Sequence, residues 1–225
     1  MPKKSLQVGW DWKKVKDFSY WKMPDGYVIN LPYRIKKQKA KVLDLGCGVG
    51  RHTIFFSSIG YDVSAMDISE EAVRSTKEWL DKEGLNAKVE IGKMTELPFQ
   101  DNDFDLVVAF NVIYHAYKHD VIRTISEISR VLKPGGYLFL TLLTKDPSIP
   151  FYGEGIVDEQ TIIKLEEPEK GIPHFFFKLE DVFEFFKGYE FKDFYYKEWY
   201  SQPITIEKIN KKKGSGHYVL FAQRK

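Results

Sequence analysis

Apolar residues in the first two thirds of the chain alternate between short strand-like runs and stretches with helical spacing. Runs rich in Val, Leu and Ile are typical of strands, whereas apolar residues three and four positions apart are typical of helices. The pattern predicts strands over residues 41–45, 61–66, 87–91, 104–110 and 137–143, and helices over residues 51–58, 69–83 and 120–132. Strands and helices that alternate in this way predict βαβ units around a parallel sheet.

The two flanks of this alternating region differ from it. Residues 1–38 are aromatic and basic, and residues 145–177 are irregular and interrupted by proline and glycine. After them the pattern predicts a helix over residues 179–186, a loosely alternating segment over 189–200 and a strand over 217–223. The last two segments bring the number of expected strands to seven.

The composition agrees with such a fold. Hydrophobic residues make up 43% and charged residues 29% of the 225 positions, a balance typical of a globular domain. No apolar run approaches the roughly 20 residues that span a bilayer, and the first residues show no apolar signal core, so we expect a cytoplasmic protein with no membrane association. The single cysteine and five scattered histidines show no metal-ligand spacing, and we expect no metal site.

Charge is unevenly distributed along the chain. Residues 1–41 contain 11 lysines and arginines against three aspartates, a net charge of +8 that leaves −6 for the remainder of a chain with a total of +2. Such asymmetry can indicate an anionic partner. Dedicated nucleic-acid binders usually carry a more basic total, so we favour a solvated arm and expect no nucleic-acid partner.

The candidate chemistry begins where the first predicted strand ends. Residues 46–51, Gly-Cys-Gly-Val-Gly-Arg, follow that strand and precede a helix, and glycines there let the backbone approach a ligand. Asp67 ends the next strand, where a carboxylate can accept both hydroxyls of a ribose. The run departs from the dehydrogenase pattern Gly-x-Gly-x-x-Gly, because the third glycine comes one residue early.

These segments resemble the motifs of the class I S-adenosylmethionine-dependent methyltransferases. The likeness follows family order through residues 42–50 (Val-Leu-Asp-Leu-Gly-Cys-Gly-Val-Gly), 66–69 (Met-Asp-Ile-Ser), 92–99 (Gly-Lys-Met-Thr-Glu-Leu-Pro-Phe), 104–107 (Phe-Asp-Leu-Val) and 130–136 (Arg-Val-Leu-Lys-Pro-Gly-Gly). It implies an α/β fold with a doubly wound, mostly parallel, seven-stranded, Rossmann-like sheet. It also implies one domain over residues 1–225, with residues 1–38 as an arm or lid and residues 145–177 as a substrate-side insertion.

The resemblance implies S-adenosylmethionine as the cofactor and assigns residues to it. The implied set is Gly46, Cys47, Gly48, Arg51, Asp67, Ile68, Lys93, Met94 and Asn111. The first three would pass under the methionine part, Asp67 would hold the ribose and Ile68 would pack on the adenine. Lys93 and Met94 would flank the adenine edge, and the backbone carbonyl of Asn111 would face the methionine end.

Three of the residues near the first motif have open roles. Arg51 either clamps the methionine carboxylate or simply begins the helix, and Asp44 either orients the glycine loop or contacts the cofactor. Cys47 is expected to be a small packing residue. Lys93 departs from the family, which often has an aspartate there that accepts a hydrogen bond from the adenine amino group, and a lysine ammonium cannot accept one.

The acceptor side of the site is less well defined by the sequence. Candidate substrate residues are Tyr20, Trp21, Tyr114, His115 and His174. His115, His174 and Tyr20 are also candidates for a general base, although a packed loop histidine is an equally simple role for His174. Aromatic residues of the arm and the insertion either close over the pocket or cover the edge of the core; they are Trp10, Trp12, Tyr20, Trp21, Phe151, Tyr152 and Phe175 to Phe177.

The sequence therefore predicts an enzyme, a methyltransferase that moves a methyl group in line onto a small molecule. The first alternative is a nucleic-acid methyltransferase that uses the basic arm, although residues 111–114, Asn-Val-Ile-Tyr, lack the Pro-Pro of the amino-directed enzymes. The second is a non-catalytic S-adenosylmethionine-binding module, and a dehydrogenase is a more distant third. We expect a monomer or a homodimer.

Overall fold

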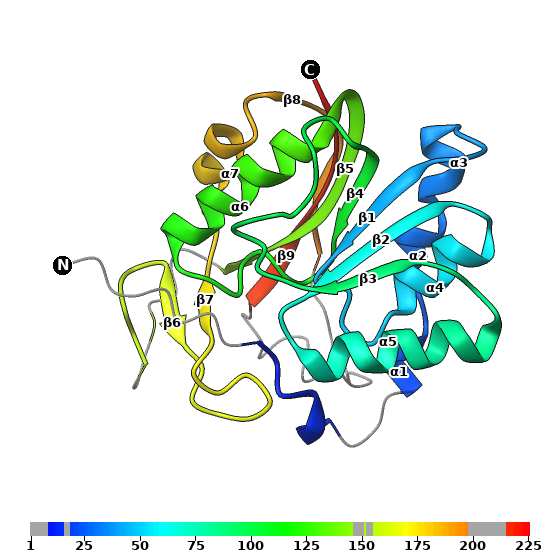
Figure 1. Ribbon diagram of the computed structural model, residues 1–225. Coiled ribbons are helices and arrows are strands. Elements are labelled where there is room, and N and C mark those ends of the chain that lie inside the picture. Colours follow the sequence, from blue (N-terminus) through cyan, green and yellow to red (C-terminus); the bar gives the residue numbers. More distant parts are fainter. Residues whose placement is uncertain (1–8, 16–18, 146–150, 152–154, 198–214) are drawn as a thin grey trace, which may run out of the picture.

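The computed structural model describes residues 9–15, 19–145, 151, 155–197 and 215–225, and Figure 1 shows the arrangement of their elements. The main sheet has seven strands in the order β3-β2-β1-β4-β5-β9-β8. They are β1 (Lys41–Leu45), β2 (Asp62–Asp67), β3 (Lys88–Ile91), β4 (Phe104–Ala109), β5 (Leu132–Lys145), β8 (Tyr189–Lys197) and β9 (Ser215–Arg224). Strands β1 to β5 pair in parallel, and β9 runs antiparallel to both β5 and β8. The predicted doubly wound, mostly parallel sheet is confirmed.

Helices cover both faces of this sheet (Figure 1). They are α1 (Ser19–Lys22), α2 (Gly26–Ile29), α3 (Leu31–Ile35), α4 (Arg51–Ser58), α5 (Glu70–Glu83), α6 (Lys118–Val131) and α7 (Leu179–Phe185), with a 3₁₀ turn at Trp12–Lys14. Helices α2, α3 and α4 pack on one face of the sheet, and α6 and α7 pack on the other.

The strand side chains alternate between these two cores. Val42 and Leu106 face the core beneath α3 and α4, whereas their neighbours Leu43 and Val107 face the core beneath α6. All four side chains are fully buried. A strand covered on both faces is mostly apolar, which explains the nearly continuous apolar runs in the sequence.

The boundaries of two predicted elements differ from the structure. Helix α6 ends at Val131 and β5 begins at once, so the strand starts before the predicted position 137. Phe104 pairs with Leu132 and Leu106 pairs with Tyr137, which leaves residues 133–136 as an irregular loop within the ladder. Gly135 has a φ of 74°, a conformation that a glycine adopts readily.

The segment after β5 is more ordered than its sequence indicates. It contains a two-stranded antiparallel hairpin of β6 (Thr161–Ile163) and β7 (Pro173–Phe175), in which Ile162 pairs with His174. The expectation of an irregular segment is therefore corrected for these strands. This hairpin brings residues 164–174 to the carboxyl edge of the main sheet. None of the described helices is long and apolar enough to cross a membrane.

Candidate functional site

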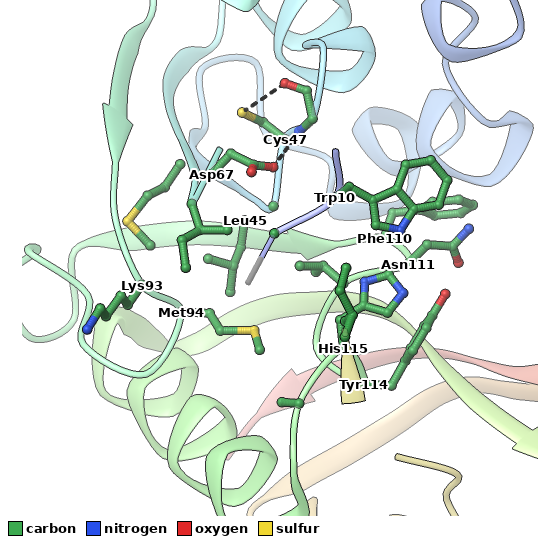
Figure 2. Close-up of a pocket in the computed structure, with 18 of the residues that line it drawn as sticks. Trp10, Leu45, Cys47, Asp67, Lys93, Met94, Phe110, Asn111, Tyr114 and His115 are labelled. Carbon is green, nitrogen blue, oxygen red and sulfur yellow. Dashed lines mark hydrogen bonds between the residues drawn. The ribbon is translucent and has the colours of Figure 1, made fainter. Parts of the chain in front are cut away.

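A cavity of about 300 Å³ opens at the carboxyl ends of β1, β2 and β4. In a parallel α/β sheet this edge, where the strand order reverses, is the usual place for a ligand. The loops after these three strands line it, together with the N-terminal arm and residues of the segment that follows β5 (Figure 2).

The glycine loop, residues 46–50, forms the floor of the cavity. Gly46, Gly48 and Gly50 have φ angles of 68°, 55° and 95°, which other residues adopt only with strain. A Cβ on Gly46 would lie 2.3 Å from Cγ2 of Val112, and one on Gly48 would lie 2.8 Å from the Trp12 ring. Val112 and Trp12 thus pack directly against the backbone of the loop, and residues 46–49 line the cavity.

Asp67 fixes this loop to the end of β2. One carboxylate oxygen accepts a hydrogen bond from the Gly48 N–H at 2.9 Å, and the other accepts one from the Ser69 N–H at 2.9 Å. Burial raises the pKa of this carboxyl, and the backbone donors oppose that effect. Because each oxygen has a second lone pair, both can still accept a hydroxyl from a ligand.

The structure gives Asp44 and Arg51 different positions relative to the cavity. Asp44 is not among the described residues that line the cavity; it is buried and accepts a hydrogen bond from the Thr53 hydroxyl at 2.7 Å. Burial raises its pKa to about 6. Asp44 thus ties β1 to α4, in line with an orienting role. Arg51 lines the cavity, with its guanidinium 5.5 Å from the Trp21 ring centre and 5.0 Å from that of Phe110.

Cys47 is a buried residue whose thiol packs with apolar residues beneath α5. Its Sγ donates to the Gly48 carbonyl at 3.7 Å, and burial raises the pKa of the thiol well above its ordinary value. A thiol held neutral in an apolar environment is unreactive. These observations agree with the expected packing role.

Ile68, Lys93 and Met94 lie at the other end of the cavity, and all three line it. Figure 2 shows the Met94 side chain turned toward the space and the Lys93 ammonium pointing away from it. Lys93 is exposed, whereas Met94 is half-buried. Only the Lys93 backbone and the base of its side chain remain beside the ligand space.

Asn111 stands directly after β4 with a φ of 56°. Its N–H donates to the Thr141 hydroxyl at 2.8 Å, and that hydroxyl donates to the Asn111 side-chain oxygen at 2.7 Å. Thr141 is fully buried in β5. These two hydrogen bonds to Thr141 of the neighbouring strand β5 hold Asn111 in a strained conformation at the cavity wall.

Three tryptophans, Trp10, Trp12 and Trp21, form an aromatic roof over the cavity. Their ring centres lie 5.0 to 5.5 Å apart, and all three line the cavity. Phe175 and Phe177, in the segment 145–177, do not line the cavity, because they are buried in the core beneath α6. Tyr152 lies outside the described residues, and so does the side chain of Tyr20.

A second group of polar side chains lies opposite the glycine loop. This imidazole cluster consists of Tyr114, His115, Glu169, His174 and His217. The Glu169 Oε1 atom lies 3.2 Å from Nε2 of His174 and 3.7 Å from Nε2 of His115, and Tyr114 and His217 are joined at 3.2 Å. Tyr114, His115 and Glu169 line the cavity, whereas His174 is buried behind them.

The protonation of the cluster follows from its burial. Burial, then the neighbouring His174, lowers the pKa of His115 to about 3, and burial lowers that of His217 to about 4. Burial would raise the pKa of Glu169, but the contact with His174 and the nearby Lys164 ammonium oppose burial, and the value is lowered to about 2. Glu169 is thus an anion at neutral pH beside neutral rings of His115 and His217.

Comparison with known proteins places the central part of the chain in a family. Residues 42–136 match the model of the methyltransferase domain. This part of the chain is therefore similar to that family. The resemblance to class I S-adenosylmethionine-dependent methyltransferases, with S-adenosylmethionine as the family's cofactor, is therefore confirmed.

Among the relatives, the sterol 24-C-methyltransferase ERG6B of Gibberella zeae is 41% identical over 105 residues, 44% of this chain and 27% of that protein. The demethylmenaquinone methyltransferase of Staphylococcus saprophyticus is 34% identical over 120 residues, 52% of this chain and 49% of that protein. The chain thus spans less than half the length of these relatives. A solved methyltransferase of Methanosarcina mazei has a TM-score of 0.69 at 24% identity, covering 86% of this chain and 96% of its own, which shows the shared fold.

The cavity of this methyltransferase domain fits the family's cofactor. Asp67 is half-buried and offers two carboxylate oxygens, and Gly46 and Gly48 line the cavity with backbone alone. Ile68 and Met94 supply apolar surface at one end, as a base ring requires, and the glycine loop supplies backbone at the other.

Three participants were missed from the sequence: Thr141, Glu169 and His217. Thr141 is one threonine within an apolar strand. Glu169 lies close to Glu166 and Glu167, and nothing in the sequence distinguishes it from these two acids. Trp10 and Trp12 were expected either to close over the pocket or to cover the edge of the core, and the arm places them in the cavity wall.

Proposed function

We propose that this protein is an S-adenosylmethionine-dependent methyltransferase whose acceptor is a small molecule. The observation that carries the proposal is Asp67, half-buried and bonded to the glycine loop, in a cavity that three tryptophans also line. We also propose that residues 1–225 act as one domain, with residues 1–38 as its lid.

In this proposal each wall of the cavity binds a different part of the cofactor or the acceptor. Asp67 holds the ribose hydroxyls, Ile68 and Met94 pack on the adenine, and the glycine loop lies under the methionine part. Arg51, held between Trp21 and Phe110, faces the methionine carboxylate, since a guanidinium pairs well with a carboxylate. The remaining wall, with Tyr114 and His115, faces the acceptor.

S-adenosylmethionine, when bound, supplies a methyl group on a sulfonium sulfur. The protein's contribution is to hold the acceptor in line with that group, and such positioning can supply several kcal/mol of the barrier. The aromatic roof excludes water from the cavity and so favours a reaction that disperses charge. Aromatic faces also attract a cation, which suits the tryptophans Trp10, Trp12 and Trp21.

Three features support a small acceptor over a nucleic acid. The cavity of about 300 Å³ lies at the small end of the range for small-molecule sites. In the basic N-terminal part, Lys37 and Lys41 pair with Asp105 and Asp103, and Arg34 pairs with Asp193, so carboxylates of the protein itself balance these charges. The names of the two relatives described above, a sterol and a demethylmenaquinone methyltransferase, also specify small acceptors.

Calorimetry with the demethylated product, S-adenosylhomocysteine, tests the cofactor site. We expect micromolar binding, roughly −8 kcal/mol. No heat at millimolar ligand would overturn the proposal.

The acceptor class is tested separately with methyl-labelled S-adenosylmethionine. The protein is incubated with a small-molecule cell extract in one reaction and with RNA or DNA in another. We expect label in the small-molecule fraction; label confined to nucleic acid would support the alternative enzyme. Cofactor binding without transfer to any fraction would support the non-catalytic module.

A further inference from the structure

The strongest unassigned feature is the set of ring nitrogens that surround one oxygen of Glu169. His174 Nε2 lies 3.2 Å from Oε1 and His115 Nε2 lies 3.7 Å from the same atom. Trp10 Nε1 donates a hydrogen bond to it at 3.1 Å. The other carboxylate oxygen, Oε2, lies 3.7 Å from the Lys164 ammonium.

The tautomer of His174 defines what its Nε2 presents to Glu169. Nδ1 lies 3.2 Å from the carbonyl oxygen of Ile172, and a carbonyl only accepts, so the proton sits on Nδ1. A ring that carries only this proton turns its Nε2 lone pair toward the carboxylate. A lone pair that faces a carboxylate at 3.2 Å requires a proton or a cation between them, and His115 Nε2 faces the same oxygen.

The three groups have the composition and spacing of a metal site. Their ligand atoms all lie within 4.8 Å of one another. Ligand atoms bound to one ion through bonds of about 2.0–2.2 Å lie roughly 3.0–3.6 Å apart, close to the two distances to Oε1. Two imidazoles and one carboxylate are a ligand set that first-row divalent metals accept.

The surroundings of the three groups resemble those of bound metals. A histidine that binds a metal usually donates its other ring N–H to a carbonyl or carboxylate, and this contact orients the ring. The His174 contact with Ile172 has this form, and the Trp10 N–H orients the Glu169 carboxylate in the same way.

We propose that His115, Glu169 and His174 bind a divalent first-row transition-metal ion on the acceptor side of the cavity. Because His115 and Glu169 line the cavity, coordination positions not taken by the protein face it. An acceptor with a hydroxyl or carboxylate oxygen can occupy such a position beside the cofactor. The binding of an acceptor to the ion rests on the proposed function, whereas the binding of the ion itself does not. The site departs from the sequence expectation of no metal, because its ligands come from segments more than 50 positions apart.

The test is a titration of tag-free, chelator-treated protein with Co²⁺, followed by visible absorption and by displacement with Zn²⁺. We expect one Co²⁺ per chain, with absorption bands of nitrogen and oxygen coordination. His174→Gln and Glu169→Gln should each weaken binding by about 100-fold or more, since loss of even an outer contact costs 10–100-fold. Matched controls are His119→Gln and Glu159→Gln, two exposed residues outside the cluster, which should bind Co²⁺ like the wild type.

Wild-type protein that binds no Co²⁺ would overturn the proposal and leave His174 and Glu169 as an ion pair. Unchanged affinity in both cluster variants would also overturn it. Circular dichroism checks that each variant is folded, and His115→Gln replaces either variant that is not. S-adenosylhomocysteine calorimetry on the same samples separates the two claims, because cofactor binding without Co²⁺ binding contradicts only the metal site.

Discussion

The two halves of the cavity are held together by different parts of the chain. In the cofactor half, the N–H groups of Gly46 and Cys47 donate to the Met66 carbonyl at 2.7 and 3.1 Å, and Gly48 donates to Asp67. The first two are backbone contacts, the third reaches the Asp67 side chain, and all three join the ends of the adjacent strands β1 and β2. In the acceptor half, Trp10 and Glu169 are joined by one side-chain hydrogen bond across 159 positions of sequence.

This difference between the two halves indicates where the fold tolerates substitutions. Substitutions in the cofactor half disturb backbone geometry that also shapes the sheet edge, so few are tolerated. The acceptor half is made of side chains carried on an arm and a hairpin outside the main sheet. It can acquire new chemistry while the fold stays the same, as is general for sites on shared folds.

Asp67→Ala should have the largest effect, because it removes the anchor of the cofactor half. Two hydrogen bonds from ribose to a half-buried carboxylate would be lost, about 3 kcal/mol or roughly 100-fold in affinity for S-adenosylhomocysteine. Calorimetry measures the change. Asp62→Ala, at the exposed opposite end of β2, is the control and should bind normally. Equal affinity in both variants would place the ribose elsewhere.

Gly46→Ala should destabilise the protein by about 2 kcal/mol, because it combines backbone strain with a clash against Val112. Gly60→Ala separates the two causes, since Gly60 also has a positive φ, 81°, but no atom within 4 Å of the added Cβ. Urea unfolding of both variants gives the comparison. We expect Gly46→Ala to be the more destabilised by about 1 kcal/mol or more. Equal losses would mean that the glycine loop moves freely to accept a side chain.

Trp10→Phe tests the acceptor half, because it keeps the ring and removes the N–H that binds Glu169. A hydrogen bond to a carboxylate is worth about 1.5 kcal/mol, so the arm should open roughly tenfold more often. Hydrogen exchange at the Asp11 N–H, which donates to the Pro168 carbonyl at 3.2 Å, reports this opening. Affinity for S-adenosylhomocysteine should change little.

The control for this variant is Trp79→Phe, whose indole N–H donates to Glu83 on the exposed face of α5. It should leave exchange in the arm unchanged. If Trp10→Phe also leaves that exchange unchanged, the arm is held by its aromatic contacts alone and the acceptor half is more rigid than we infer.

The same division explains what the sequence could predict. The order of the sheet and the positions of Gly46 and Asp67 follow from short consecutive segments, whose apolar periods and glycines act locally. Glu169 has no such signal, because its function depends on where a hairpin places it relative to His115. Thr141 supports Asn111 only through the pairing of β4 with β5, which the sequence of neither strand specifies.

Lys93→Ala should have the smallest effect, although Lys93 is the clearest departure from the family pattern. Its side chain is exposed and directed away from the cavity (Figure 2), so we expect affinity for S-adenosylhomocysteine to change less than about twofold. Lys93→Asp restores the residue that the family often has and should strengthen binding by roughly fivefold, about 1 kcal/mol, if the new carboxylate reaches the adenine amino group. Calorimetry on both variants distinguishes the two effects. A large loss in Lys93→Ala would show that the ammonium contacts the cofactor, and the cofactor half would then depend on a second charged side chain besides Asp67.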